Sequence, residues 1–327
     1  MFRIQKLSVF ICVHLWLAWS CALPAAAQPA YPAKTIRMIV PFPPGGGNDI
    51  VGRLLAQRLG EGVGQQVIVD NRGGAGGTIG TELTAKAPPD GYTLLINNIS
   101  LAVNATLYPK LPYDTLRDFA GVTQVASVPN VLVVGPGSGI KSVKELIALA
   151  KSKPGQMNYG SAGIGTGTHL NGEQFKLAVG IDVVHVPFRG TPEALTDTAT
   201  GRINYFFSPI VPALPFVRDK RLVALGVTTL TRSSVLPDVP TVAEAGVPGF
   251  EFDLWIGILA PAKTPRPILT KMSVEVGRVL AMPDIRERML SQGTTPKPTT
   301  PEEFDRFVRA EVERVGKIVR ASGARAD

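Results

Sequence analysis

The chain has few of the residues that form covalent cross-links and metal sites. Its two cysteines, Cys12 and Cys21, both lie in an apolar stretch near the N-terminus, and of its three histidines only His169 and His185 lie beyond that stretch. Disulfides, thiol chemistry and histidine-rich zinc sites are therefore not expected in the rest of the chain. We expect neither a metal nor a cofactor.

Signatures of nucleotide binding and hydrolase chemistry are also missing from the sequence. There is no G-x-x-x-x-G-K-[ST] motif, and no glycine-rich stretch has the spacing G-x-G-x-x-G. The nucleophile elbow G-x-S-x-G needs glycine two residues before the serine, but Tyr159 stands there before Ser161. A hydrolase that uses Ser161 is kept as an alternative, which loss of esterase turnover in Ser161→Ala would support. We expect a binding protein and not an enzyme.

Charge is biased toward positive values but is not clustered. The formal net charge is +8, and the lysines and arginines are scattered among acidic residues. Nucleic-acid binding is not expected, because it calls for a basic cluster or for interleaved aromatic residues. The excess of positive charge is compatible with an affinity for anions.

The first 27 residues have the pattern of a secretory signal. Arg3 and Lys6 precede an apolar run from Leu7 to Leu23, and small residues follow up to Ala27. We predict cleavage after Ala27 and export of the remaining chain; an uncleaved membrane anchor is the alternative. No later apolar run has the length needed to cross a bilayer.

Stretches rich in valine, isoleucine and leucine alternate with stretches of helical periodicity. The expected strands are TIRMIV, QVIVD, TLLINN and VLVVG, and the expected helices cover residues 50–59, 79–87 and 143–151. This alternation predicts an α/β protein with mostly parallel sheets. The chain that remains after the predicted signal has about 300 residues, which is more than one hydrophobic core usually supports, so we expect two domains.

Two helix starts carry the capping-box pattern. In this pattern the N-cap residue and the residue three positions later each accept, through the side chain, the free backbone N–H of the other. Ser142 with Glu145 and Thr300 with Glu303 have the required spacing. The helix that follows Thr300 has one apolar stripe from Phe304 to Val319, so it is expected to pack against a large surface and to close the first domain.

Glycine-rich loops stand between a strand and a helix in both halves of the chain. PPGGGND covers residues 43–49, and GSAGIGTGTH covers residues 160–169. A helix start presents backbone N–H groups without partners and the positive end of the helix dipole, so it holds an anion without a cationic side chain. Such loops gather beyond the carboxyl ends of strands. We therefore predict an anion site in a cleft between the two halves.

Several candidate ligand residues carry an open alternative. Asp49 either caps its helix or orders a ligand, His169 either donates to ligand or has a structural role, and Arg189 either contacts a carboxylate or is solvated. Exposed amides are expected at Gly163 and Gly165, and residues 97–100 are expected to sort ligands. The full set of predicted ligand-binding residues is Pro43, Pro44, Gly45, Gly46, Gly47, Asn48, Asp49, Asn97, Ser161, Gly163, Gly165, Thr166, His169 and Arg189.

Six segments of the chain, in order, resemble the solute receptors of tripartite tricarboxylate transporters, also called Bug proteins. The similarity covers essentially the whole chain after residue 27. The segments are YPAKTIRMIVPFPPGGGNDIVGRLLAQRL, VIVDNRGGAGGTIGTELTAKAPPDGYTLLI, YGSAGIGTGTHLNGEQF, VPFRGTPEALTDTATG, LPDVPTVAEAGVPGFEFDLWIGILAPAKTP and TPEEFDRFVRAEVERVGKIVRASG.

The resemblance implies a type II periplasmic binding protein, with two α/β domains, a ligand cleft between them and crossing strands that join them. We place the crossings near Pro129 and Phe252. The expected division is a signal peptide at 1–27, domain I at 28–128 plus 252–327, and domain II at 129–251. Trp255, on the expected return strand, should report domain closure by its fluorescence.

The resemblance also implies a function. Such a receptor captures a dicarboxylate, tricarboxylate, acidic amino acid or aromatic acid in the periplasm and delivers it to a permease of one large and one small membrane subunit. One ligand carboxylate is expected against backbone groups and waters of the loops 43–49 and 161–169. We expect a monomer, and a receptor that docks to a sensor kinase remains an alternative.

Two departures from the family leave the ligand open. The family often has Tyr-Lys where this chain has Phe188 and Arg189, and a second aromatic residue where it has Ile256. Arginine keeps the charge of lysine but adds a planar fork, so the far end of the ligand can be recognised differently.

Overall fold

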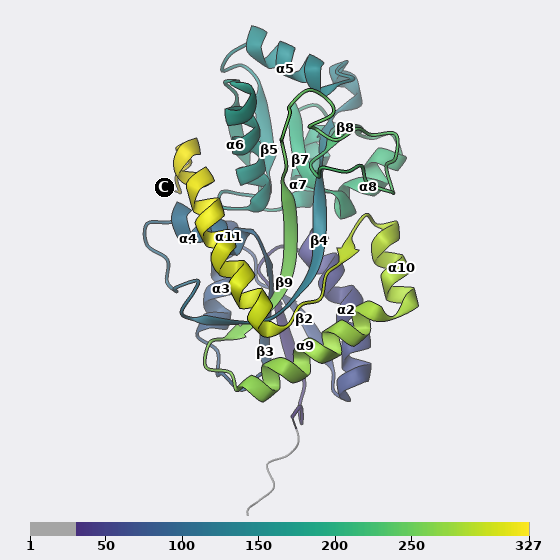
Figure 1. Cartoon of the computed structure of the whole chain (residues 1–327). Coiled ribbons are helices and arrows are strands. Elements are labelled where there is room, and N and C mark those ends of the chain that lie inside the picture. Colours follow the sequence, from purple (N-terminus) through teal and green to yellow (C-terminus); the bar gives the residue numbers. More distant parts are fainter. Residues whose placement is uncertain (1–30, 327) are drawn as a thin grey trace, which may run out of the picture. The chain divides into compact units, whose positions relative to one another are not determined.

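The computed structural model describes residues 31–326, so the predicted signal peptide at 1–27 lies outside the described residues. Residues Lys34–Asp327 form one compact unit, and this unit alone is described below (Figure 1). None of the helices in the described part combines the length and hydropathy needed to cross a bilayer.

The N-terminal third of this unit alternates strands and helices as the sequence predicts. The predicted helix at 50–59 lies inside a longer helix that begins directly after the glycine loop. The elements are β1 (Ile36–Val40), α2 (Gly47–Val63), β2 (Val67–Asn71), η1 (Ala75–Gly77), α3 (Thr78–Ala85), β3 (Thr93–Asn98) and α4 (Ser100–Leu107).

The rest of the chain continues the alternation and ends in three helices. The elements are β4 (Phe119–Val134), η2 (Pro136–Ser138), α5 (Val143–Ser152), β5 (Asn158–Ser161), α6 (Gly167–Val179), β6 (Val184–Pro187), α7 (Thr191–Ala199), β7 (Tyr205–Pro209), α8 (Ile210–Arg218), β8 (Val223–Val227), β9 (Asp253–Pro261), α9 (Arg266–Ala281), α10 (Pro283–Ser291), β10 (Thr295–Pro296) and α11 (Pro301–Ser322).

The strands form one mixed sheet in the order β2-β1-β3-β9-β4-β7-β5-β6. The outer strands are parallel, since β1 pairs with β2 and β3, and β5 pairs with β6 and β7. The prediction of mostly parallel sheets is wrong for the middle, where β9 and β4 are antiparallel to their neighbours. The reason is topological: β4 carries the chain from one domain into the other, and β9 brings it back in the opposite direction.

The two crossing strands lie where the sequence suggested. β4 pairs with β9 from Phe119 to Pro129 and changes partner to β7 at Asn130. β9 starts at Asp253, one residue after Phe252 donates its amide to Thr228 O at 2.9 Å. Both strands run through the two halves of the unit (Figure 1). This α/β arrangement, with two strands that cross between its halves, is the one that the family resemblance predicts.

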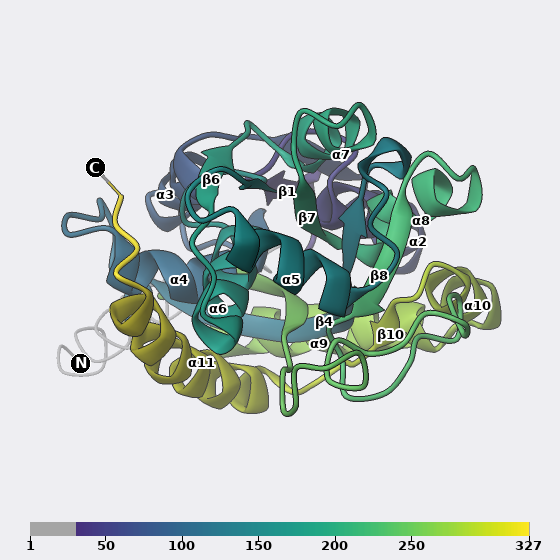
Figure 2. The ribbon, with the colours of Figure 1, turned by 90° about the horizontal axis from the view of Figure 1, so that it is seen from above.

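The last helix packs along one side of this sheet, beside α4 and α6 (Figure 2). Its capping box is complete, because Thr300 Oγ1 accepts from Glu303 N at 3.2 Å and the Glu303 carboxylate accepts from Thr300 N at 2.8 Å. Phe304, in its first turn, meets Trp255 of β9 edge-on with ring centroids 5.7 Å apart. Contact with α6 shows that α11 reaches beyond the first domain, which it was expected to close.

The box predicted at Ser142 is only half formed. Ser142 Oγ accepts from Glu145 N at 3.2 Å, but the Glu145 carboxylate accepts from Lys141 N at 2.7 Å and does not return to Ser142. One of the two predicted bonds is therefore present at the start of α5.

Gly257 of β9 provides a test of this packing. A Cβ atom at Gly257 would overlap the ring of Phe304, so Gly257→Ala should lower the free energy of unfolding by about 1–3 kcal/mol. Gly277→Ala in α9 is the matched control, since its Cβ would lie 3.9 Å from the nearest atom; it should be neutral or stabilise by about 0.5–1 kcal/mol. Urea unfolding of both variants measures this. If the two variants are equally stable, the packing of the Phe304 ring does not require a glycine at position 257.

Candidate functional site

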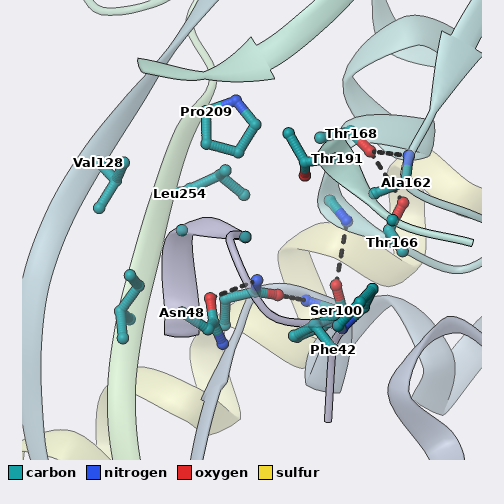
Figure 3. A pocket seen from close by; sticks show the side chains of 17 residues that line it. Phe42, Asn48, Ser100, Val128, Ala162, Thr166, Thr168, Thr191, Pro209 and Leu254 are labelled. Carbon is teal, nitrogen blue, oxygen red and sulfur yellow. Dashed lines mark hydrogen bonds between the residues drawn. The ribbon is translucent and has the colours of Figure 1, made fainter. Parts of the chain in front are cut away.

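The two predicted glycine loops border one small cavity (Figure 3). We call it the inner cavity and define it by Gly46 to Asn48 on one wall and Thr166 to Thr168 on the other. Its volume is about 40 Å³, which is room for a few atoms or water molecules. The loops that the sequence placed in separate halves therefore face each other.

Helix starts surround this cavity. Residues at or next to the N-terminus of five helices line it, and the lining contains no charged side chain. Because each helix start carries a partial positive charge, an anion there would be stabilised without a counter-cation. The five are α2 at Gly46 to Asn48, α4 at Ser100, α6 at Thr166 to Thr168, α7 at Gly190 and Thr191, and α8 at Pro209.

The start of α2 is left open toward the cavity. Within the described residues no side chain caps its first turn, and Ile50 is the first residue whose amide reaches an intrahelical acceptor, Gly46 O at 3.0 Å. The amides of Gly47 and Asn48 thus remain as donors at the cavity wall. The sequence predicted that Gly45 to Gly47 precede the helix, but it left open whether Asp49 caps it.

A chain of hydrogen bonds links the two walls. Asn98 Nδ2 donates to Asn48 Oδ1 at 2.9 Å, and Asn98 Oδ1 accepts from Ser100 N at 2.9 Å. Ser100 Oγ then accepts from the amide of Gly167, in the first turn of α6, at 3.1 Å. The dashed bond from Ser100 crosses the cavity in Figure 3. The side chains of α2, β3 and α4 therefore fix the position of the α6 start.

Asp49 turns away from the cavity and holds its own loop. Its carboxylate accepts from Gly45 N, Arg53 Nε and Asn71 Nδ2, each at 2.9 Å. Burial opposes ionisation, but these hydrogen bonds and the charge of Arg53 outweigh it and lower the pKa of Asp49 below its ordinary value of 3.8. Asp49 therefore neither caps the first turn of α2 nor lines the cavity, and it holds the glycine loop that precedes the helix.

The second loop satisfies most of its own donors. Thr166 Oγ1 accepts from His169 N at 3.3 Å and donates to Gly163 O at 2.7 Å, so it caps α6. Gly163 N donates to Ser161 Oγ at 3.1 Å, and Gly165 N points at His169 Nδ1 at 3.4 Å. The expectation of exposed amides at Gly163 and Gly165 is therefore wrong. The amide of Thr168, inside the first turn, is the donor that the loop leaves beside the cavity.

Ser161 and His169 belong to a buried polar cluster below the loop. Ser161 Oγ lies 2.6 Å from His185 Nε2, and the rings of His169 and His185 stack with centroids 4.1 Å apart. Burial lowers the pKa of His169, and it lowers that of His185 to about 3. Ser161 has no exposed surface, so no substrate reaches it. The cluster supports the loop and offers no nucleophile.

A larger cavity opens outside the inner one. We call it the outer cavity: its volume is about 970 Å³, and it shares Phe42, Pro43, Ala162 and Gly190 with the inner cavity. Its other walls come from the glycine loop 73–77 and from the segment that leads into α7. A ligand whose head occupies the inner cavity would extend into this space.

The predicted residues fall into three groups. Pro43, Gly46, Gly47, Asn48 and Thr166 line the inner cavity. A second group lines only the outer cavity: Pro44, Gly163 and Arg189. The third group lines neither cavity: Gly45, Asp49, Asn97, Ser161, Gly165 and His169.

Strand alternation explains two of the displaced predictions. Asn97 donates to Thr81 Oγ1 at 3.1 Å, and its neighbour Asn98 takes the place on the inner cavity. Leu254 and Ile256 line the cavity, so Trp255 between them points to the opposite face and donates to Glu311 at 3.0 Å. Trp255 is thus poorly placed to sense ligand directly.

Sequence reasoning missed several lining residues. Thr191 and Pro209 stand at the starts of α7 and α8, and Val128 and Leu254 stand on the crossing strands. The pattern of strand, short turn and helix around Thr191 and Pro209 was a usable signal. Nothing local in the sequence marked Val128 and Leu254.

No group of three or more potential metal ligands gathers within residues 31–326. The lining of the inner cavity offers amides, hydroxyls and apolar walls, and the outer cavity adds the charged side chains of Arg189 and Glu193.

Comparison with known proteins agrees with this geometry. The profile of the tripartite tricarboxylate transporter family receptor matches residues 51–324. The chain belongs to this family. BugT of Bordetella pertussis is 38% identical over 306 residues, which cover 93% of this chain and 94% of BugT.

Two solved structures extend the comparison to ligand-bound relatives. A Rhodopseudomonas palustris protein solved with adipate is 34% identical, with a TM-score of 0.87 over 90% of this chain and 98% of that one. MatC of the same species, solved with bound malate, is 32% identical, with a TM-score of 0.84 over 88% of this chain and 100% of that one. The receptor family comprises periplasmic solute-binding proteins. This receptor is not an enzyme.

The role of Asp49 is open to a direct test. Asp49→Asn removes the negative charge that pairs with Arg53 and replaces one carboxylate oxygen, an acceptor, with an NH₂ group, a donor. It should therefore destabilise the fold by about 1–3 kcal/mol. Because the pKa of Asp49 is lowered, the difference from wild type should be constant near neutral pH and shrink as pH falls below about 4. Unfolding at several pH values measures it. Asp284→Asn, which breaks an exposed pair with Arg58, is the control and should cost less than about 1 kcal/mol. A loss that stays the same as the pH falls through the acidic range would contradict this role.

Proposed function

We propose that this receptor captures a small organic carboxylate, with the carboxylate head in the inner cavity and the rest of the ligand in the outer cavity. The observation that carries the proposal is the convergence of five helix starts on a cavity without a charged side chain. The free donors are amides of Gly47, Asn48 and Thr168, which suit a carboxylate and offer nothing to a cation. Relatives solved with adipate and malate support the same ligand class.

Closure of the two domains would complete the site. The bodies that move are residues 28–128 with 252–327 and residues 129–251, with β4 and β9 as the hinge. Contacts across the cleft are close: a Cβ at Gly190 would overlap Pro43, and one at Gly76 would overlap Ile164 O. Such contacts indicate that the arrangement described here is the closed one.

The receptor would then deliver its ligand to a permease of one large and one small membrane subunit, as the family name suggests. We infer export to the periplasm through cleavage after Ala27 and action as a monomer. The N-terminal sequence pattern and the membership of the receptor family support export. Ligand would be released when the domains reopen at the permease.

Binding of a carboxylate is the first test of this function. A site of this kind ordinarily has a micromolar dissociation constant, which is about −8 kcal/mol. Thermal unfolding with a panel of carboxylates, each supplied at 100 times that constant, should show a stabilisation of about 2.7 kcal/mol for at least one. The matched primary amides should give no shift. Absence of any shift across the panel would refute the proposal.

Closure is tested separately at Gly190. Its φ of 168° is extended backbone, so Gly190→Ala should leave each domain intact but hold them apart through the clash with Pro43. The penalty on closure of about 1–3 kcal/mol predicts at least a fivefold loss of affinity. Gly137→Ala, where a Cβ meets nothing within 4 Å, is the control. Unchanged affinity in Gly190→Ala, measured by calorimetry, would contradict closure.

A further inference from the structure

The outer cavity has an apolar and aromatic wall. Phe42, Tyr108 and Phe188 reach it from three separate segments, and each is only half buried. Burial raises the pKa of Tyr108, so its phenol stays neutral at ordinary pH. Glycines and prolines supply most of the remaining wall, which leaves few side chains that project into the space. These surfaces suit a flat apolar body.

The charges on the outer cavity cancel. Arg189 and Glu193 are the two charged side chains that line it within the described residues. The Glu193 carboxylate accepts the backbone amide of Arg189 at 3.2 Å, which holds it on the same wall. The inner cavity offers one helix-start site for one carboxylate. A second ligand carboxylate in the outer cavity would meet the negative charge of Glu193 as well as the positive charge of Arg189, so its net electrostatic gain would be small.

We propose that this receptor selects a monocarboxylate with a flat aromatic body over dicarboxylates and tricarboxylates. The proposal rests on the proposed function, because it assumes that the carboxylate head lies in the inner cavity. The aromatic ring would lie between Phe42 and Phe188 in the outer cavity. Selection would come from the zero net charge of the outer wall, where Arg189 and Glu193 carry opposite charges, and from the aromatic wall.

Calorimetry on the purified exported protein tests the selection. The probes are benzoate, phenylacetate and cinnamate against malate, adipate and citrate, with cinnamamide as the uncharged control. At least one aromatic acid should bind tenfold more tightly than every member of the second set. Equal or tighter binding of malate, adipate or citrate would overturn the inference and leave the proposed function standing. Binding by no carboxylate of either set would overturn both.

Two variants locate the selectivity. Glu193→Gln keeps the acceptor for the Arg189 amide but removes the negative charge, so it should raise affinity for adipate relative to cinnamate about fivefold. Phe188→Ala should weaken cinnamate about tenfold. Phe216→Ala is the matched control. Phe216 lies on α8, is half buried beneath the guanidinium of Arg221, and lines neither cavity. Unchanged cinnamate affinity in Phe188→Ala, or an unchanged affinity ratio in Glu193→Gln, would overturn the inference.

Discussion

Unpaired backbone amides at helix starts are the constraint on which this receptor depends. The first turn of a helix has donors without internal acceptors, and a buried donor without a partner is unfavourable. In the structure, Gly47, Asn48 and Thr168 border a cavity of only about 40 Å³. A carboxylate would supply their acceptors, so binding and closure would stabilise each other.

The sheet puts these helix starts in one place. In each domain, parallel strands bring their carboxyl ends and the helices that follow them to a common edge. The antiparallel strands β4 and β9 join the domains, and Val128 and Leu254 on them form part of the floor. Asn98, Ser100 and Gly167 then connect the two walls by hydrogen bonds. Position of the amides is thus set by backbone topology more than by any single side chain.

Glycine has a second role at the domain junction. Gly76, Gly165 and Gly190 stand where a Cβ would overlap an atom of the facing segment: Ile164 O, Asn104 Oδ1 and the Pro43 ring respectively. These positions allow the backbones of the two domains to approach closely. If the domains close on ligand as proposed, these loops would need glycine both for ligand access and for closure.

The sequence predicted the alternation of strands and helices, the two loops and the crossing points, because each has a local signature. It named segment 97–100 but chose Asn97 as the ligand residue, whereas Asn98 lines the cavity; it did not predict that Leu254 and Ile256 of the return strand line it too. Nor did it predict that Ser161 would bond to His185, which lies beside it because β5 pairs with β6; for His169 a structural role was one of two open alternatives. Such outcomes depend on contacts between distant segments.

The account is tested most directly by nuclear magnetic resonance. The ¹⁵N-labelled receptor is titrated with a carboxylate that the calorimetry has shown to bind. The amide protons of Gly47, Asn48 and Thr168 should move downfield together, at one ligand per chain, because they become donors to a charged acceptor. If these three amides keep their shifts while the signals of Arg189 and its neighbours alone change, the carboxylate binds a cationic side chain, and recognition by helix starts is wrong.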